Sequence, residues 1–95
     1  GQFLSPEATR PLLEKAEEVG ARDRVWLTER GVSFGYGGLV VDMSGIPVMR
    51  SFGVPVIYDA THSVQTPGVS AAGIGVTGGA RSKIEPLARA AIAAG

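Results

Sequence analysis

The chain has no cysteine, no excess of charge of either sign and no long hydrophobic run. The lack of cysteine excludes a disulfide scaffold and every metal site built on thiolates. Nine Lys and Arg balance nine Asp and Glu, which argues against nucleic-acid or anionic-membrane partners, because these require a basic face. No apolar run approaches the roughly 20 residues of a membrane span, and we expect no signal peptide. We therefore expect a cytoplasmic protein with neither nucleic-acid nor membrane partner.

Three segments carry the signals of helices. Apolar residues recur at helical spacing over residues 6–19, after a candidate N-cap at Ser5 and before a glycine terminator. A shorter apolar pattern over residues 45–52 predicts a second helix. A capping-box pattern at Ser82 predicts the start of a last helix, with Pro86 in its first turn.

Two short apolar runs, residues 25–27 and 54–58, predict strands covered on both faces, as in a parallel sheet. A glycine-rich stretch, 31–38, follows the first strand, and a long loop over 62–80 follows the second. Short turns before strands and long loops after them are typical of a (β/α)₈ barrel, which needs about 250 residues. We therefore predict an α/β fold in which residues 1–95 form an incomplete segment of a single TIM-barrel domain.

Polar side chains follow each predicted strand. Arg30 comes after the first strand and His62 after the second, so neighbouring barrel strands would bring both to the same rim. A guanidinium matches carboxylate or phosphate oxygens, and an imidazole can bind a metal or move a proton. The pair predicts a small anionic substrate. Two plainer interpretations stay open: His62 is a structural group, or Glu29 and Arg30 form a surface ion pair.

Several segments, taken in order, resemble those of the 3-deoxy-D-manno-octulosonate 8-phosphate synthase (KDO-8-phosphate synthase) family. They are Gly-Gln-Phe-Leu at 1–4, Leu-Thr-Glu-Arg-Gly at 27–31, Phe-Gly-Tyr at 34–36, Leu-Val-Val-Asp-Met at 39–43 and Tyr-Asp-Ala-Thr-His-Ser-Val-Gln at 58–65. Gly-Gly-Ala-Arg at 78–81 resembles the family's loop before the seventh helix. The resemblance extends over almost the whole chain.

The resemblance implies a transferase that condenses phosphoenolpyruvate with D-arabinose 5-phosphate. The products are 3-deoxy-D-manno-octulosonate 8-phosphate, used in lipopolysaccharide biosynthesis, and inorganic phosphate. The family is a (β/α)₈ barrel, usually a homotetramer, and this chain would supply about strands 6 and 7 with their flanking helices.

The resemblance also implies roles for four residues. Arg30 would hold the phosphoenolpyruvate anion, and His62 would lie beside its reacting carbons as a catalytic residue. Gln2 and Gln65 would supply neutral hydrogen bonds in the same pocket. The cofactor is none or one divalent metal ion, with His62 as a ligand only in a metal-dependent member and the remaining ligands outside this chain.

Three further charged residues, Asp42, Asp59 and Arg81, have no assigned role, and for the two aspartates we expect supporting or structural roles. Three alternatives stay open for the function. The first is the related heptulosonate-phosphate (DAHP) synthase, which uses erythrose 4-phosphate. The second is an inactive fragment that lacks half of the site, and the third is a small phosphate-binding module.

Overall fold

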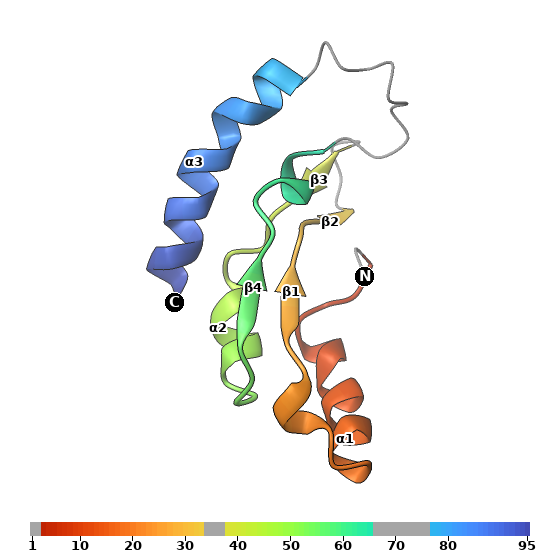
Figure 1. Ribbon diagram of the computed structural model, residues 1–95. Coiled ribbons are helices and arrows are strands. Elements are labelled where there is room, and N and C mark those ends of the chain that lie inside the picture. Colours follow the sequence, from red (N-terminus) through yellow and green to blue (C-terminus); the bar gives the residue numbers. More distant parts are fainter. Residues whose placement is uncertain (1–2, 34–37, 66–76) are drawn as a thin grey trace.

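The computed structural model describes residues 3–33, 38–65 and 77–95. Helices and strands alternate along the chain, so the predicted α/β class is confirmed (Figure 1). The elements, in order, are η1 (Glu7–Thr9), α1 (Arg10–Glu18), η2 (Arg22–Arg24), β1 (Leu27–Glu29), β2 (Val32–Ser33), β3 (Leu39–Val40), α2 (Gly45–Arg50), β4 (Val56–Tyr58), η3 (His62–Val64) and α3 (Thr77–Ala94).

Strands β1 and β4 form the predicted parallel pair. The register places Leu27 opposite Val56 and Glu29 opposite Tyr58. Side chains alternate across this pair: Leu27 and Glu29 are buried, whereas Thr28 between them is exposed. Because alternate residues of a strand point to opposite faces, one face of the pair is packed and the other is open.

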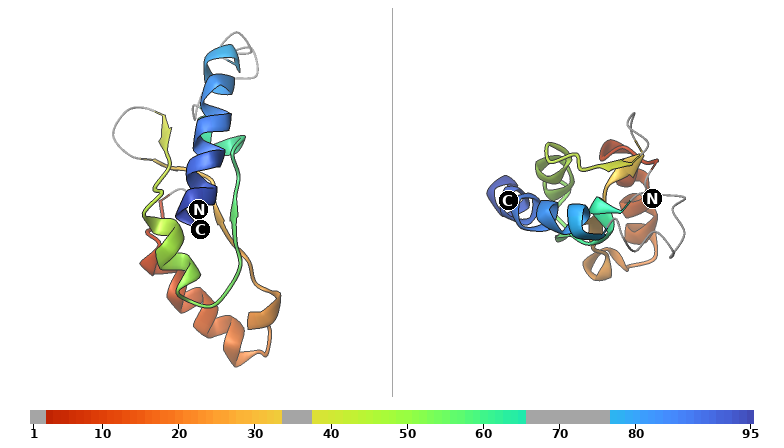
Figure 2. Two further views of the ribbon diagram at one scale, coloured as in Figure 1. Left: turned by 90° about the vertical axis from the view of Figure 1, so that its left-hand side faces the viewer. Right: turned by 90° about the horizontal axis from the view of Figure 1, so that it is seen from above.

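The packed face is covered by two helices. The core cluster of buried residues joins Leu13 of α1, Leu27 of β1 and Met49 of α2 with Phe52 and Val54. Burying a side chain of this size contributes about 1.5–3 kcal/mol, so this cluster is the main source of stability in the described residues. Helices α1 and α3 lie on opposite sides of the strand pair (Figures 1 and 2).

The first helix ends where the sequence predicts, but its start differs: residues 7–9 form the 3-10 helix η1, and α1 begins at Arg10 with Thr9 as its N-cap. The Ser5 hydroxyl oxygen accepts a hydrogen bond from the Ala8 amide at 3.2 Å, within the turn that leads into η1. At the other end Gly20 has φ +68°, and the Gly20 and Ala21 amides donate to the carbonyls of Glu17 and Ala16. This pair of bonds is a Schellman motif, which ends the helix where the sequence predicts.

Three details of the prediction are wrong. The run 25–27 is not covered on both faces, because Trp26 lies on the open face and is 63% exposed. Helix α3 begins at Thr77 rather than Ser82, so Ser82 is not an N-cap and Pro86 lies inside the helix rather than in its first turn. A Ser-x-x-Glu pattern is typical of the start of a helix. Here the helix has already begun before Ser82, so the pattern lies inside it.

The glycine-rich stretch contains a feature that the sequence did not indicate. Val32–Ser33 (β2) and Leu39–Val40 (β3) pair antiparallel, with Val32 opposite Val40. The hairpin follows directly from the end of β1. Two-residue strands carry too little periodicity to be recognised in a sequence.

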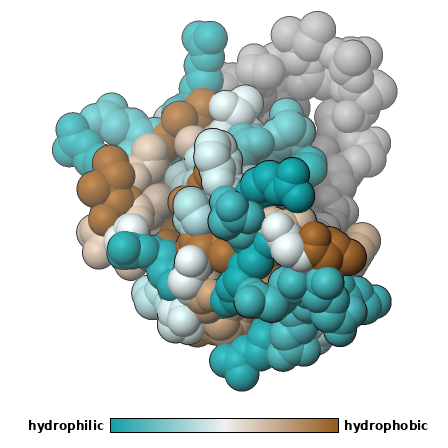
Figure 3. Space-filling model, turned by 60° about the horizontal axis from the view of Figure 1, so that its bottom comes forward, coloured by the Kyte–Doolittle hydropathy of each residue, from teal (hydrophilic) through white to brown (hydrophobic). Residues whose placement is uncertain are grey.

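The molecule is elongated, at 46 × 27 × 23 Å, with a radius of gyration of 14.6 Å. A closely packed chain of 95 residues would have a radius near 12 Å. Several large apolar side chains are exposed, among them Trp26 and Ile92, which is 80% exposed. Figure 3 shows hydrophobic surface in several separate places on one side of the molecule. No helix among the described residues is long and apolar enough to cross a membrane.

These open surfaces generate a prediction for the 95 residues studied alone. Both sheets have two strands, and an isolated pair of strands is only marginally stable in water. We expect the purified 95-residue peptide to show a broad thermal transition by circular dichroism and no condensation activity. A sharp cooperative transition from a sample shown to be monomeric would contradict this expectation.

Candidate active site

The carboxyl ends of β1 and β4 bring two polar segments together. The Asp59 amide donates a hydrogen bond of 2.8 Å to the Glu29 carbonyl, directly after the register that pairs Glu29 with Tyr58. Arg30 and the turn that contains His62 therefore leave neighbouring positions at the same end of the sheet. The prediction that Arg30 and His62 follow adjacent strand ends is confirmed.

Gly31 joins the two segments by close contact. Its φ is +91°, and a Cβ placed on it would lie 2.9 Å from the Leu39 Cβ and 3.2 Å from the Ser63 Cα. The first distance is too short for a Cβ and the second is unusually tight, and the backbone conformation itself favours glycine. Gly31, which follows Arg30, thus packs against Ser63, which follows His62. Ser63 is 2% exposed, and its hydroxyl contacts the Tyr58 hydroxyl at 2.6 Å.

Glu29 is a buried carboxyl group at the carboxyl end of β1, directly before Arg30. We call this end of the strand pair, with the Arg30 and His62 segments, the rim. Glu29 is 5% exposed, and its Oε1 accepts a hydrogen bond of 2.8 Å from the Gly31 amide. Burial raises the pKa of Glu29, the bond from Gly31 opposes that rise, and the negative charge of Asp42 adds to it. Sequence reasoning missed this residue as a buried group. Its burial could have been inferred from the sequence, because Glu29 comes two residues after Leu27 and alternate residues of a strand share a face.

Arg30 is exposed and has no hydrogen bond or ion pair with the residues that the structure describes. The expected alternative of a surface ion pair with Glu29 is therefore wrong. Arg30 is among the residues that line a pocket, together with Glu29, Gly31 and Asp42. A guanidinium that has no partner among the described residues can bind carboxylate or phosphate oxygens.

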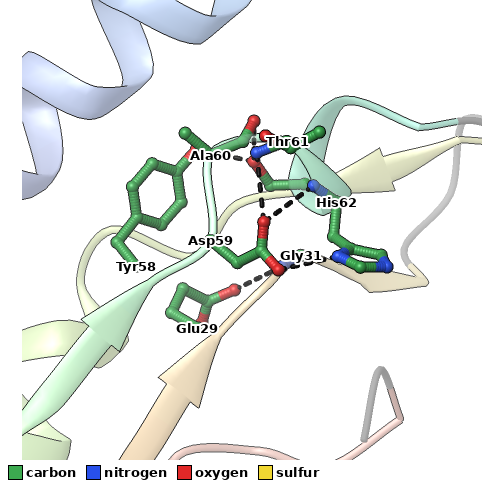
Figure 4. A network of polar contacts seen from close by, with 8 residues as sticks. Glu29, Gly31, Tyr58, Asp59, Ala60, Thr61 and His62 are labelled. Carbon is green, nitrogen blue, oxygen red and sulfur yellow. Dashed lines mark hydrogen bonds and ion pairs between the residues drawn. The ribbon is translucent and has the colours of Figure 1, made fainter.

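The His62 imidazole is held by Asp59 (Figure 4). Oδ2 of Asp59 lies 2.7 Å from Nδ1 of His62, and Oδ1 accepts hydrogen bonds from the amides of Thr61 and His62 at 3.1 and 2.9 Å. The hydrogen bond from the His62 amide is the main reason why the pKa of Asp59 lies below its usual range, followed by that from the imidazole. The second ring nitrogen, Nε2, points away from Asp59.

The other predicted site residues fall in different places. Gln65 is exposed and follows η3 directly, whereas Gln2 lies outside the described residues. Arg81 is exposed on α3. His62 does not line the pocket that contains Arg30. The structure thus brings the Arg30 and His62 segments into contact without placing both side chains in one described cavity.

The described residues do not form a complete metal site. They contain no group of three or more His, Cys, Asp or Glu side chains that could hold an ion. Nδ1 of His62 faces Asp59, so Nε2 is the ring nitrogen of His62 that could bind an ion. A divalent ion needs further ligands, so the presence of a metal stays a prediction.

The whole chain, residues 1–95, matches the family model described as the DAHP synthetase I family. The chain belongs to this family. It is 55% identical over 96 residues to the 2-dehydro-3-deoxyphosphooctonate aldolase of Nitratidesulfovibrio vulgaris (strain DP4) and 58% identical over 95 residues to that of Desulfotalea psychrophila. The protein of the same name from Thiobacillus denitrificans is 52% identical over 95 residues.

Each of these matches covers 100% of the chain, but only 32–33% of the relative. The chain therefore spans about a third of the length of the curated relatives that it matches. The resemblance to the octulosonate-phosphate synthases is confirmed by the shared name of these family members.

The burial of Glu29 generates a prediction for a chimera, in which these 95 residues replace the matching third of the Nitratidesulfovibrio vulgaris relative. Because burial raises the Glu29 pKa, the group favours folding below its unfolded pKa, and this contribution is lost as pH rises through the folded pKa. Gln keeps an acceptor for the Gly31 amide without the charge. We expect Glu29→Gln to raise the thermal midpoint at about pH 7 and to lose that advantage near about pH 4.

Glu29→Ala is the matched variant, because it leaves the buried Gly31 amide without its acceptor. It should cost about 1–3 kcal/mol of the free energy of unfolding at either pH. Calorimetry of both variants at the two pH values makes the comparison. A Glu29→Gln chimera that is less stable than its parent at neutral pH would show that the carboxylate has a favourable partner.

Proposed function

We propose that this chain forms part of the active site of a synthase that condenses phosphoenolpyruvate with D-arabinose 5-phosphate. The products would be 3-deoxy-D-manno-octulosonate 8-phosphate and inorganic phosphate, which makes the enzyme a transferase of lipopolysaccharide biosynthesis. The observation that carries the proposal is Arg30, which has no ion pair among the described residues, at the strand end beside the His62 turn, in a chain whose relatives are named 2-dehydro-3-deoxyphosphooctonate aldolase.

The chain would supply about strands 6 and 7, with flanking helices, to a single (β/α)₈ barrel domain. The parallel β1–β4 pair supports this placement, as does its open face, which bears Trp26, Thr28 and Ile57. In a barrel the opposite face of each strand packs against helices, as Leu27 does here, and the open face lines the interior. We further propose a cytoplasmic homotetramer that acts on small molecules only.

Phosphoenolpyruvate carries a carboxylate and a phosphate, so its binding requires cationic groups. The Arg30 guanidinium would hold the anion through its fork of donors. Water attacks the middle carbon of phosphoenolpyruvate while the terminal carbon forms a bond to the aldehyde carbon of the sugar, whose oxygen takes up a proton. The carbon–oxygen bond to phosphate then breaks, and the keto acid remains. The pocket would act mainly through orientation and electrostatic stabilisation.

His62 would lie beside the reacting carbons, and Gln2 and Gln65 would donate neutral hydrogen bonds. His62 can serve with no metal or as one ligand of a divalent ion whose other ligands lie outside this chain. Such an ion would polarise an oxygen of the substrate as a Lewis acid. Either arrangement requires a free imidazole nitrogen, and the outward direction of Nε2 supports both.

The sugar substrate separates the proposal from its rival, a DAHP synthase that uses erythrose 4-phosphate. The relatives compared here share the octonate name, which favours the five-carbon sugar. We expect the chimera to release phosphate from phosphoenolpyruvate faster with arabinose 5-phosphate than with erythrose 4-phosphate. The unmodified relative is the positive control, and a preference for the shorter sugar would defeat the proposal.

Arg30 provides the test of anion binding. Arg30→Ala in the chimera should lower kcat/KM for phosphoenolpyruvate by about 100-fold or more, because a charged hydrogen-bond donor to the substrate is lost. Arg30→Lys should recover only part of this loss, since an ammonium lacks the fork. Arg24 is exposed in η2, before the same strand, and Arg24→Ala is the matched control. If the Arg30→Ala and Arg24→Ala chimeras have equal kinetics, Arg30 does not bind the substrate.

A further inference from the structure

The carboxylate of Asp59 makes three contacts with the turn that follows β4. One oxygen, Oδ1, accepts the Thr61 and His62 amides, and the other, Oδ2, faces the His62 ring nitrogen Nδ1 at 2.7 Å. The first two bonds fix the backbone of the turn where η3 begins. The third bond does not stabilise the backbone, and it therefore suggests a second role.

The contact between Asp59 and the ring determines which ring nitrogen carries the proton. An ionised carboxylate can only accept hydrogen bonds, and Oδ1 of Asp59 already accepts two backbone amides, as a carboxylate does. Nδ1 must then donate, so a neutral His62 is protonated on Nδ1 and unprotonated on Nε2. Free imidazole side chains favour the opposite tautomer, so this one has to be imposed.

We propose that Asp59 is a positioning residue, which holds His62 as the Nδ1–H tautomer and directs the Nε2 lone pair away from Asp59. This inference rests on the proposed function for its catalytic consequence. The tautomer itself is a property of the chain. Partners that orient a functional histidine in this way typically contribute 10- to 100-fold to metal affinity or activity.

The Arg30 end of the rim supports this assignment. Gly31 packs against the Ser63 backbone, so the turn that carries His62 is fixed against the segment that carries Arg30. Rotation of the ring about its own bonds is then the main remaining freedom of His62. The bond from Nδ1 to Asp59 removes it.

Asp59→Asn separates the two roles of the carboxylate. The Asn side-chain oxygen can still accept the two amides of the turn, but its NH₂ group would face Nδ1 and donate to it. Nδ1 would then be an acceptor, and the proton would move to Nε2. In the chimera we expect the tautomer to reverse, kcat to fall at least about tenfold, and KM for phosphoenolpyruvate to change much less.

The tautomer is read from the ¹⁵N chemical shifts of the two ring nitrogens in metal-free protein at about pH 8. The His62 signal is identified by its loss in His62→Gln. Ser63→Ala is the control for a loosened turn, because it removes the bonds of the Ser63 hydroxyl to Tyr58 and Ala60 but leaves the Asp59 contacts in place. This variant should lower the thermal midpoint and keep the Nδ1–H tautomer.

An Nε2–H tautomer in the parent chimera overturns the inference, and so does an Asp59→Asn variant with unchanged kcat. If the parent chimera has the expected tautomer but no activity with arabinose 5-phosphate, the proposed function fails and the tautomer assignment stands. If the chimera does not fold, a graft of residues 58–65 alone into the relative carries the same Asp59–His62 pair and receives the same measurements.

Discussion

The parallel pairing of β1 with β4 is the constraint on which the candidate site depends. Its register sets Glu29 beside Tyr58, and the next hydrogen bond, from the Asp59 amide to the Glu29 carbonyl, fixes where both strands end. Arg30 and the Asp59–His62 turn must then start from adjacent positions. A shift of one residue would move Arg30 to the packed face and Glu29 to the open one, because side chains alternate along a strand. The chemistry of the rim therefore depends on backbone hydrogen bonds several residues away.

Gly31 converts this proximity into contact. A Cβ at this position would lie 2.9 Å from the Leu39 Cβ and 3.2 Å from the Ser63 Cα, so Leu39 and the His62 turn would both have to move away. The buried Glu29 carboxyl then holds the Gly31 amide from below. Three successive residues thus have separate tasks: Glu29 anchors the turn, Arg30 presents its charge, and Gly31 permits the close approach.

Much of this arrangement could be predicted from the sequence, and the exceptions have physical reasons. The parallel strands, the first helix and the strand-end positions of Arg30 and His62 follow from local patterns that tertiary packing did not override. The hairpin of β2 and β3 could not be foreseen, because two-residue strands have no periodicity. The start of α3 at Thr77 was missed because a capping-box pattern is only one of several ways to begin a helix. The bond between Asp59 and His62 depends on a turn geometry that no spacing rule specifies.

Glu29 and Asp59, two carboxyl groups close to Arg30 and His62, have opposite environments. Burial raises the pKa of Glu29 and disfavours its charge, so Glu29 competes weakly for the Arg30 guanidinium. Hydrogen bonds lower the pKa of Asp59 and keep it a pure acceptor, so it can impose one tautomer on His62. If both groups were exposed and ionised, Arg30 would be neutralised by its own neighbours rather than by a ligand. A site for an anion needs its carboxylates either buried or already bound, and each of these two meets one of those conditions.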